Sequence, residues 1–206
     1  MWKQIPNILT GGRLVLAVIF LVMIFLEPGL AANRDTSFYL DVAFVIFLIA
    51  GLTDIIDGPI ARKLNVTSKF GRMVDPLADK VLICGAFIVF ALIGQPKLFN
   101  LTKFQLAIIQ WGFAAIIIAR ETLVTILRHW SESRGIKFPA TLSGKIKMFV
   151  QAFAVGTVLV KMAHVQTPAW GYWFTTITYL ITISITVISG FMSLKKIKIR
   201  PDSPLL

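Results

Sequence analysis

The chain has 206 residues, of which 56% are hydrophobic and only 15% are charged, whereas about 25% of the residues of an ordinary soluble domain are charged. This composition excludes an ordinary soluble protein and predicts one membrane-embedded domain over residues 1–206, because no Ser-, Gly- or Pro-rich stretch marks a linker. The net charge of +11 does not indicate nucleic-acid binding, since the basic residues lie between apolar segments and are expected to contact the headgroups of membrane lipids.

The first predicted helix spans residues 9–26. Its basic start and apolar run resemble a signal peptide, but it lacks a convincing small-x-small cleavage site and several more apolar segments follow, so it is expected to be retained. Before it, Met1–Asn7 place Trp2 and Ile5 beside polar residues. This segment predicts a short N-terminal interfacial helix or anchor in the headgroup layer, with a disordered end as the alternative.

Five further apolar segments follow, each close to the roughly 20 residues that a spanning helix needs. Pro59 predicts a kink just below the first of them. Pro76 suits the first turn of the next helix, so Asp75 is expected to cap that helix. The predicted fold is all-α, an integral membrane bundle of six transmembrane helices. Its last five spans are residues 38–56, 76–94, 104–127, 147–165 and 170–193.

Basic residues are distributed unevenly between the two sides of this bundle. If the amino terminus faces the cytoplasm, the outer loops are residues 27–37, 95–103 and 166–169, and these loops with their margins carry only four of the 21 Lys and Arg residues. Loops rich in Lys and Arg stay in the cytoplasm. The distribution therefore predicts a multi-pass protein of the inner (cytoplasmic) cell membrane with both termini in the cytoplasm.

Four of the ten acidic residues lie within 26 positions, at the inner ends of the second and third spans, where charge is costly. Asp54 and Asp57 are three residues apart and Asp75 and Asp79 four apart, so each pair shares one helix face. Four adjacent carboxylates repel one another unless they are neutralised. Because such oxygen-rich sites suit hard divalent cations, we expect these aspartates to bind Mg²⁺ or Mn²⁺.

Small residues accompany the aspartates. Gly58 and Ala61 lie on the face of the first pair and Gly71 lies four residues before Asp75, where a missing side chain lets a substrate come close. Arg62 is placed to bind a phosphate with its planar fork. The alternative is that the acids pair with neighbouring Arg and Lys side chains in a solvated loop. Simple ion pairing, however, does not require glycine and alanine at fixed positions between the acids.

Together these residues resemble the complete signature of the CDP-alcohol phosphotransferase superfamily. The resemblance implies a six-helix membrane enzyme, usually a homodimer, whose active site opens to the cytoplasm and holds two divalent ions. It implies that all four aspartates are metal ligands and that Asp75 and Asp79 are catalytic, with Asp79 as general base. It implies that Asp57, Gly58, Ala61, Arg62 and Gly71 contact or make room for the CDP group. The pattern reads Asp54-x2-Asp57-Gly58-x2-Ala61-Arg62-x8-Gly71-x3-Asp75-x3-Asp79.

A second group of motifs is similar to those of bacterial phosphatidylglycerophosphate synthases. Arg120, Arg128, Lys145 and Lys147 form a basic group at the inner ends of the fourth and fifth spans, and an arginine inside an apolar run is costly. A pocket for a dianionic acceptor such as glycerol 3-phosphate would explain this group. The alternative is positive-inside anchoring with an ion pair from Arg120 to Glu121 or to an aspartate. The motifs are Pro6-Asn7-Ile8-Leu9-Thr10-x2-Arg13, Ala119-Arg120-Glu121 with Arg128, and Ser143-Gly144-Lys145-Ile146-Lys147.

The expected reaction is attack by the 1-hydroxyl of glycerol 3-phosphate on the lipid-side phosphorus of CDP-diacylglycerol, with CMP leaving and Asp79 accepting the hydroxyl proton. The second and third spans are expected to splay so that two acyl chains can enter from the side. Alternatives within the superfamily use phosphatidylglycerol, giving cardiolipin, or an inositol phosphate as acceptor. An alternative of another class is a divalent-cation transporter, which is disfavoured because the outer halves of the spans hold almost no ionisable groups except Asp41.

Overall fold

The computed structural model describes residues 5–31, 35–63, 69–134, 142–165 and 168–198. Within these ranges, the side chains of a smaller set of residues lie outside the description. That set is residues 5–10, 54–63, 69–77, 79, 132, 142–143 and 195–198.

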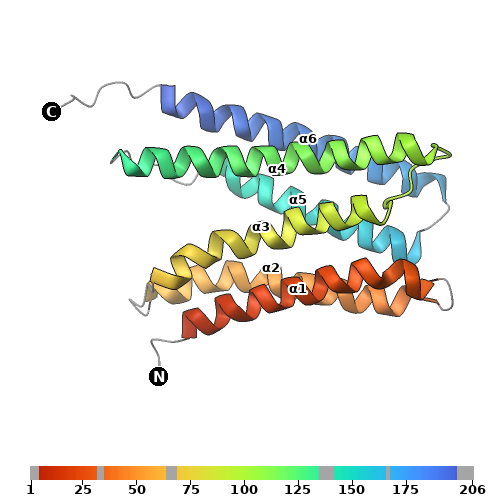
Figure 1. Cartoon of the computed structure of the whole chain (residues 1–206), viewed down its shortest axis with the longest axis horizontal. Coiled ribbons are helices and arrows are strands. Elements are labelled where there is room, and N and C mark those ends of the chain that lie inside the picture. The colour runs from red at the N-terminus through yellow and green to blue at the C-terminus, as the bar shows by residue number, and fades with distance from the viewer. Residues whose placement is uncertain (1–4, 32–34, 64–68, 135–141, 166–167, 199–206) are drawn as a thin grey trace.

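Six helices make up the described chain and alternate in direction along it (Figure 1). The four aspartates that the sequence singles out lie on α2 and α3 toward one end of the bundle, at the left of Figure 1, which we call the aspartate end. The first turns of α1, α3 and α5 and the last turns of α2, α4 and α6 also lie at this end. The helices are α1 (Ile5–Ala31), α2 (Ser37–Lys63), α3 (Lys69–Leu92), α4 (Lys103–Ser133), α5 (Leu142–His164) and α6 (Ala169–Lys198).

The six helices form two halves that follow the chain order (Figure 1). In the first half α1 packs against both α2 and α3, and in the second half α6 packs against both α4 and α5. Contacts of α2 with α5 and of α3 with α4 join the halves. Because α6 lies against both of the helices that carry the second basic group, its side chains can contact residues of both.

The core consists of small, aliphatic and aromatic side chains from all six helices. The ring centroids of Phe20 and Phe47 are 5.1 Å apart across α1 and α2. Phe113 of α4 stacks on Tyr179 of α6 with centroids 3.9 Å apart. Gly85 of α3 faces α1 so closely that a Cβ there would lie 2.7 Å from a Leu21 methyl carbon. Small residues at such positions let helices approach each other closely.

Large apolar side chains also cover the outside of the bundle, among them Phe104 and Phe149, which are 75% and 74% exposed. In water so much apolar surface would be unfavourable, whereas lipid tails solvate it. Four helices contain stretches long and apolar enough to cross a membrane, and the described side chains of α2 and α3 cover shorter apolar stretches. The protein is therefore a multi-pass membrane protein. The four long stretches are Gly11–Ala31, Lys103–Ser131, Gly144–His164 and Ala169–Leu194.

The six predicted helices are confirmed, but most extend beyond their predicted spans. The prediction that Asp75 caps the third helix is wrong, because α3 begins at Lys69 and Asp75 lies inside it. Residues 69–74 are helical although Lys69 and Arg72 interrupt their apolar residues, since hydropathy marks only the part of a helix that lies in the hydrocarbon layer. Similarly, α2 continues through Pro59 to Lys63; the kink at Pro59 stays a prediction.

The predicted separate interfacial helix at the amino terminus is not what the described residues form. Ile5–Asn7 belong to the first turns of α1 and continue directly into the first span. A helix that leaves the hydrocarbon layer can continue into the headgroup region without a break, because its backbone hydrogen bonds are internal. Residues 1–4, which complete the predicted anchor, lie outside the described residues.

Hydrogen bonds hold α2 to its neighbours at the end of the bundle opposite the aspartate end. The Tyr39 hydroxyl donates to the Met23 carbonyl of α1 at 3.1 Å. The Ser37 hydroxyl donates to the Ala163 carbonyl of α5 at 2.9 Å, and Asp41 and His164 form a pair at 2.8 Å. This attachment fixes the start of α2 at the end distant from the aspartates.

Candidate functional site

The four aspartates lie on two antiparallel helices that contact each other. Asp54 and Asp57 are in the second half of α2, and Asp75 and Asp79 in the first half of α3. The backbone is helical at all four positions, so the spacings of three and four residues place each pair on one helix face. This confirms the helical placement that the argument from spacing requires.

The roles assigned to these residues stay predictions, because their side chains lie outside the description. The same holds for Ala61 and Arg62 of α2, and Gly58 and Gly71 lie in the same two stretches of backbone. Four carboxylates carried by two adjacent helices at one end of a bundle are hard oxygen donors of the kind that Mg²⁺ and Mn²⁺ prefer. The donor set therefore fits divalent metal ions. Among the side chains that the structure describes, no other group of three or more acidic, His or Cys residues could hold a metal.

Arg120 and Lys147, two members of the second basic group, meet at one carboxylate. Nη1 of Arg120 donates to Oε1 of Glu121 at 3.3 Å, and the Nζ of Lys147, on α5, forms an ion pair with the same oxygen. The Arg120, Glu121 and Lys147 side chains are only 11%, 14% and 6% exposed. The ion pair considered as an alternative for Arg120 is thus present. A single carboxylate nevertheless faces two buried cations.

The other two members of that group, Arg128 and Lys145, lie apart from this cluster. Arg128 is two turns farther along α4 and Lys145 is in the first turn of α5, and both side chains are exposed. The structure therefore brings two of the four predicted acceptor residues together in a buried cluster and leaves two on the surface. Cations at such exposed positions are well placed to contact anionic headgroups.

Sequence reasoning missed the part that α6 plays next to Arg120. Nη2 of Arg120 donates to the Ser189 hydroxyl, and Nε2 of Gln151 on α5 donates to Oγ1 of Thr186 at 3.3 Å. Ser189 and Thr186 belong to a buried stripe of hydroxyl side chains along one face of α6. Their spacing of three and four residues inside an apolar helix was a signal that could have been found. The stripe is Thr175, Thr178, Thr182, Thr186, Ser189 and Ser193.

Arg13 is a second residue whose place the sequence did not reveal. It lies in the first half of α1, toward the aspartate end, and is 1% exposed. The sequence reading had used Arg13 only in a motif and in the charge count. A fully buried arginine beside the inner ends of the helices is costly unless it has a partner or a task.

Two ionisable residues at the opposite end also correct an expectation. Glu27 of α1 and Lys161 of α5 are buried, so the half of the bundle opposite the aspartate end holds more ionisable groups than Asp41 alone. Glu27 accepts a hydrogen bond from the Thr36 hydroxyl at 3.2 Å. The Nζ of Lys161 lies 4.4 Å from the centroid of the Tyr172 ring. Both groups thus have local partners.

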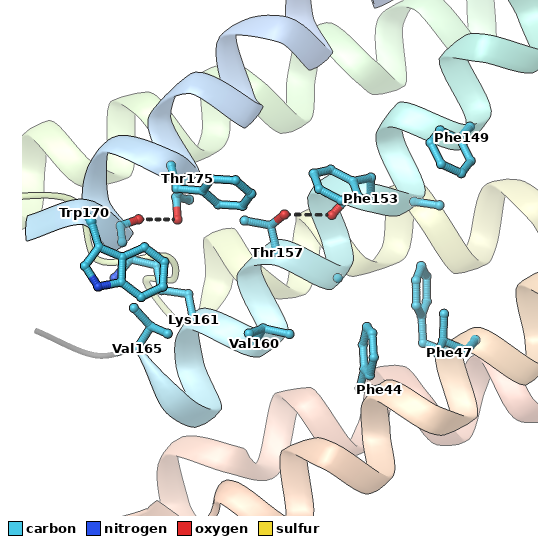
Figure 2. Close-up of a pocket in the computed structure, with 15 residues that line it drawn as sticks. Phe44, Phe47, Phe149, Phe153, Thr157, Val160, Lys161, Val165, Trp170 and Thr175 are labelled. Carbon is cyan, nitrogen blue, oxygen red and sulfur yellow. Dashed lines mark hydrogen bonds between the residues drawn. The ribbon is translucent and has the colours of Figure 1, made fainter. Parts of the chain in front are cut away.

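An apolar groove runs along α5 between α2 and α6 (Figure 2). Its volume is about 440 Å³, and within the described residues α2 and α6 do not contact each other across it. Phe44 and Phe47 of α2 face Phe149 and Phe153 of α5 (Figure 2). From Phe149 to Val165 the groove follows α5 for about 24 Å. The splay expected between the second and third spans stays a prediction, because the side chains at those ends of α2 and α3 lie outside the description.

Comparison with known proteins adds to this geometry. A model of the CDP-alcohol phosphatidyltransferase family matches residues 3–188. The chain is 34% identical over 195 residues to the CDP-diacylglycerol--glycerol-3-phosphate 3-phosphatidyltransferase of Bacillus subtilis, a match that covers 91% of this chain and 92% of the relative. It is 35% identical over 160 residues to a probable phosphatidylglycerophosphate synthase of Mycobacterium tuberculosis, covering 78% and 68% of the two chains. The chain therefore belongs to the CDP-alcohol phosphatidyltransferase family.

Proposed function

We propose that this protein transfers the phosphatidyl group of CDP-diacylglycerol to glycerol 3-phosphate and so forms phosphatidylglycerophosphate and CMP. Its family supports a transferase, and the name of the Bacillus subtilis relative states this donor and this acceptor. The observation that carries the acceptor assignment is the buried cluster in which Arg120 and Lys147 share the one carboxylate of Glu121. The two buried cations of this cluster suit the phosphate of glycerol 3-phosphate.

The donor site is proposed at the aspartate end. Asp54, Asp57, Asp75 and Asp79 would hold two divalent ions, Mg²⁺ or Mn²⁺, which when bound neutralise charge on the pyrophosphate. The CDP group would lie against the same stretches of α2 and α3. What supports this assignment is the helical backbone at the signature positions and their common end of the bundle. The residues proposed to contact CDP are Asp57, Gly58, Ala61, Arg62 and Gly71.

In the proposed reaction the 1-hydroxyl oxygen of glycerol 3-phosphate forms a bond to the lipid-side phosphorus of CDP-diacylglycerol. The bond from that phosphorus to the bridging oxygen breaks, and the oxygen leaves with CMP. Asp79 accepts the proton of the hydroxyl, and Asp75 would hold a divalent ion that neutralises charge on the pyrophosphate. Arg120 and Lys147 bind the phosphate of the acceptor, which orients its hydroxyl toward the donor.

The apolar groove is proposed to hold one acyl chain of CDP-diacylglycerol. Its lining is almost entirely apolar, and its length of about 24 Å is on the scale of a lipid tail. α1 packs against both α2 and α3, whereas α2 and α6 do not contact each other within the described residues. The Phe149 end of the groove lies closer to the aspartate end, where the headgroup would react.

The environment of the enzyme is proposed as follows. The bias of 17 of 21 basic residues toward one side supports an inner (cytoplasmic) membrane location with both termini and the active site in the cytoplasm. The alternating helices are consistent with this arrangement, because an even number of spans returns the chain to its starting side. A homodimer is proposed on the strength of the family resemblance.

Purified protein in proteoliposomes tests this function. With CDP-diacylglycerol, labelled glycerol 3-phosphate and Mg²⁺, we expect release of CMP and labelled lipid in equal amounts. Transfer to phosphatidylglycerol or to inositol phosphate, with none to glycerol 3-phosphate, would replace the acceptor. Metal-ion uptake by the same vesicles without any nucleotide substrate would instead favour the transporter.

A further inference from the structure

We propose that Ser189 and Gly190 of α6, with Glu121 of α4, are positioning residues that hold the Arg120 guanidinium for the phosphate of the acceptor. This inference rests on the proposed function and adds α6 to the acceptor site. Neither the signature nor the second group of motifs includes any residue of α6. The inference is supported by contacts to two parts of the Arg120 side chain. One set is made by its guanidinium group (the fork), and the other by its aliphatic methylene chain (the stem).

The first observation is the way the fork of Arg120 is held. Its two terminal nitrogens point to different partners, Nη1 donating to Glu121 and Nη2 to the 1% exposed hydroxyl of Ser189. A guanidinium has five N–H donors, so these two bonds leave three. One of the three, on the buried Nε, has no hydrogen-bond partner among the described residues. An anionic oxygen would satisfy this buried donor, which is otherwise costly to leave unpaired.

The second observation is the close approach of α6 to the stem of Arg120. A Cβ built on Gly190 would lie 3.3 Å from Cγ of Arg120, closer than ordinary van der Waals contact. Glycine at this position therefore makes room for the arginine stem, and its neighbour Ser189 accepts the hydrogen bond from the fork. Ser189 and Gly190, two successive residues of α6, thus contact the two parts of the Arg120 side chain and fix its position.

The third observation concerns the neighbouring helix. Lys147 of α5 reaches the same Glu121 oxygen as Arg120, and one turn of α6 before Ser189 the Thr186 hydroxyl accepts from Gln151 of α5. α4, α5 and α6 are therefore tied together around the two cations. A fixed pair of cations binds a phosphate without the entropy loss of ordering two long side chains.

The direct test is Ser189→Ala in the full-length protein reconstituted with CDP-diacylglycerol. A hydrogen bond to a charged group is removed, so we expect KM for glycerol 3-phosphate to rise about tenfold, while kcat and KM for CDP-diacylglycerol change less than about twofold. Ser189→Thr keeps the hydroxyl and should restore the wild-type KM. The matched control is Ser193→Ala, one turn on, whose buried hydroxyl donates to the Ser189 carbonyl instead; it should leave KM unchanged.

A second pair of variants tests whether Gly190 makes room for the aliphatic stem of Arg120. Gly190→Ala should push Arg120 aside and raise KM for glycerol 3-phosphate in the same selective way. Gly112→Ala is its control, because a Cβ on this glycine of α4 meets no atom within 4 Å. The two pairs are independent, so a folding defect in one variant does not prevent the test.

The outcomes separate this inference from the proposed function. If the wild-type protein releases no CMP with glycerol 3-phosphate, the function fails and the inference fails with it. If the wild type is active but both α6 variants keep KM for glycerol 3-phosphate within about twofold, only the inference is wrong. An equal loss for both substrates would make Ser189 and Gly190 merely structural and would also overturn it.

Discussion

At the scale of single residues, the protein buries several charges that a membrane makes expensive. Glu121 is 14% exposed and faces both Arg120 and Lys147, and Arg13 is 1% exposed on α1. Charges inside a membrane protein usually serve a substrate or ion site. The aspartates and this buried basic cluster are therefore the side chains to which the proposed reaction is assigned.

Asp79→Asn tests the general base. The amide cannot accept the hydroxyl proton, so we expect the rate of CMP release to fall by roughly 10²- to 10⁴-fold, with binding of CDP-diacylglycerol still measurable. Asp41→Asn is the control, since Asp41 is an acid of α2 that pairs with His164 at the opposite end. Near-normal activity of Asp79→Asn would show that another group takes the proton.

Removal of divalent cations tests the metal site. Chelation with EDTA should abolish CMP release, because unneutralised pyrophosphate charge opposes attack by the acceptor. Mg²⁺ or Mn²⁺ added back should restore activity, and Ca²⁺, which prefers more ligands and longer distances, should restore less. Full activity in EDTA would refute the proposed role of the four aspartates.

Glu121→Gln tests whether one carboxylate holds two cations. Removing one partner of a buried ion pair is destabilising, by about 3–5 kcal/mol where the pair is fully desolvated. We therefore expect a lower unfolding midpoint in a denaturing detergent titration. The double variant Glu121→Gln/Lys147→Met also removes the cation that loses this partner and should regain part of the stability. Equal midpoints for the wild type and the single variant would mean that the ion pair contributes nothing.

At the scale of helices, polar ends and packing faces decide what each element does. α3 starts with polar residues seven positions before the predicted span, so that Asp75 and Asp79 both lie on helix. α6 carries a buried stripe of hydroxyls, several of which donate to the carbonyl four residues back, as Thr182 does to Thr178 at 2.7 Å. Such bonds satisfy hydroxyls inside the bundle. The same stripe leaves Ser189 facing Arg120.

Filling the apolar groove tests its proposed role. Ala152 of α5 lines the groove, and Ala152→Trp should raise KM for CDP-diacylglycerol severalfold without changing KM for glycerol 3-phosphate, because the added ring occupies the space of an acyl chain. Ala115→Trp places the same ring on the exposed face of α4 and should be neutral. If Ala152→Trp leaves KM for CDP-diacylglycerol unchanged, the groove does not bind an acyl chain of the donor.

At the scale of the whole molecule, two three-helix halves face each other, with α1 and α6 each packing against the other two helices of its half. The aspartates belong to the first half, and the cluster of Arg120 and Lys147 to the second. The proposed donor and acceptor sites thus belong to different halves of the bundle, and the ends of α2 and α3 that carry the aspartates lie beside the last turn of α4 and the first turn of α5 at one end (Figure 1). The contacts of α2 with α5 and of α3 with α4 hold the two in register.

The orientation of this bundle can be tested with single cysteines on a Cys84→Ala background. Ser133→Cys marks the end of α4 at the aspartate end, and Lys103→Cys marks its start. In intact cells a membrane-impermeant maleimide should label Lys103→Cys, whereas Ser133→Cys should react only after permeabilisation. The reverse pattern would place the active site outside and contradict the distribution of basic residues.

The sequence alone determined the helical class, the number of helices and the four aspartates, because each depends on local patterns. Apolar runs of spanning length predict helices one at a time, and spacings of three and four residues place Asp54 with Asp57 and Asp75 with Asp79 on one face. Family membership followed from the same residues. Helix ends such as Lys69 could not be predicted, because hydropathy does not distinguish helix from loop where a helix extends beyond the hydrocarbon layer.

Only the tertiary structure decided which distant residues meet. Nothing in the sequence joins Ser189 and Gly190 to Arg120, or Lys147 to Glu121, since these contacts depend on how α6 packs between α4 and α5. It likewise left Arg128 and Lys145 exposed, apart from that buried cluster, and placed an apolar groove along α5 between α2 and α6. The 3.6-residue period of a helix tells which residues share a face, but only the packing of the helices determines which neighbouring helix that face contacts.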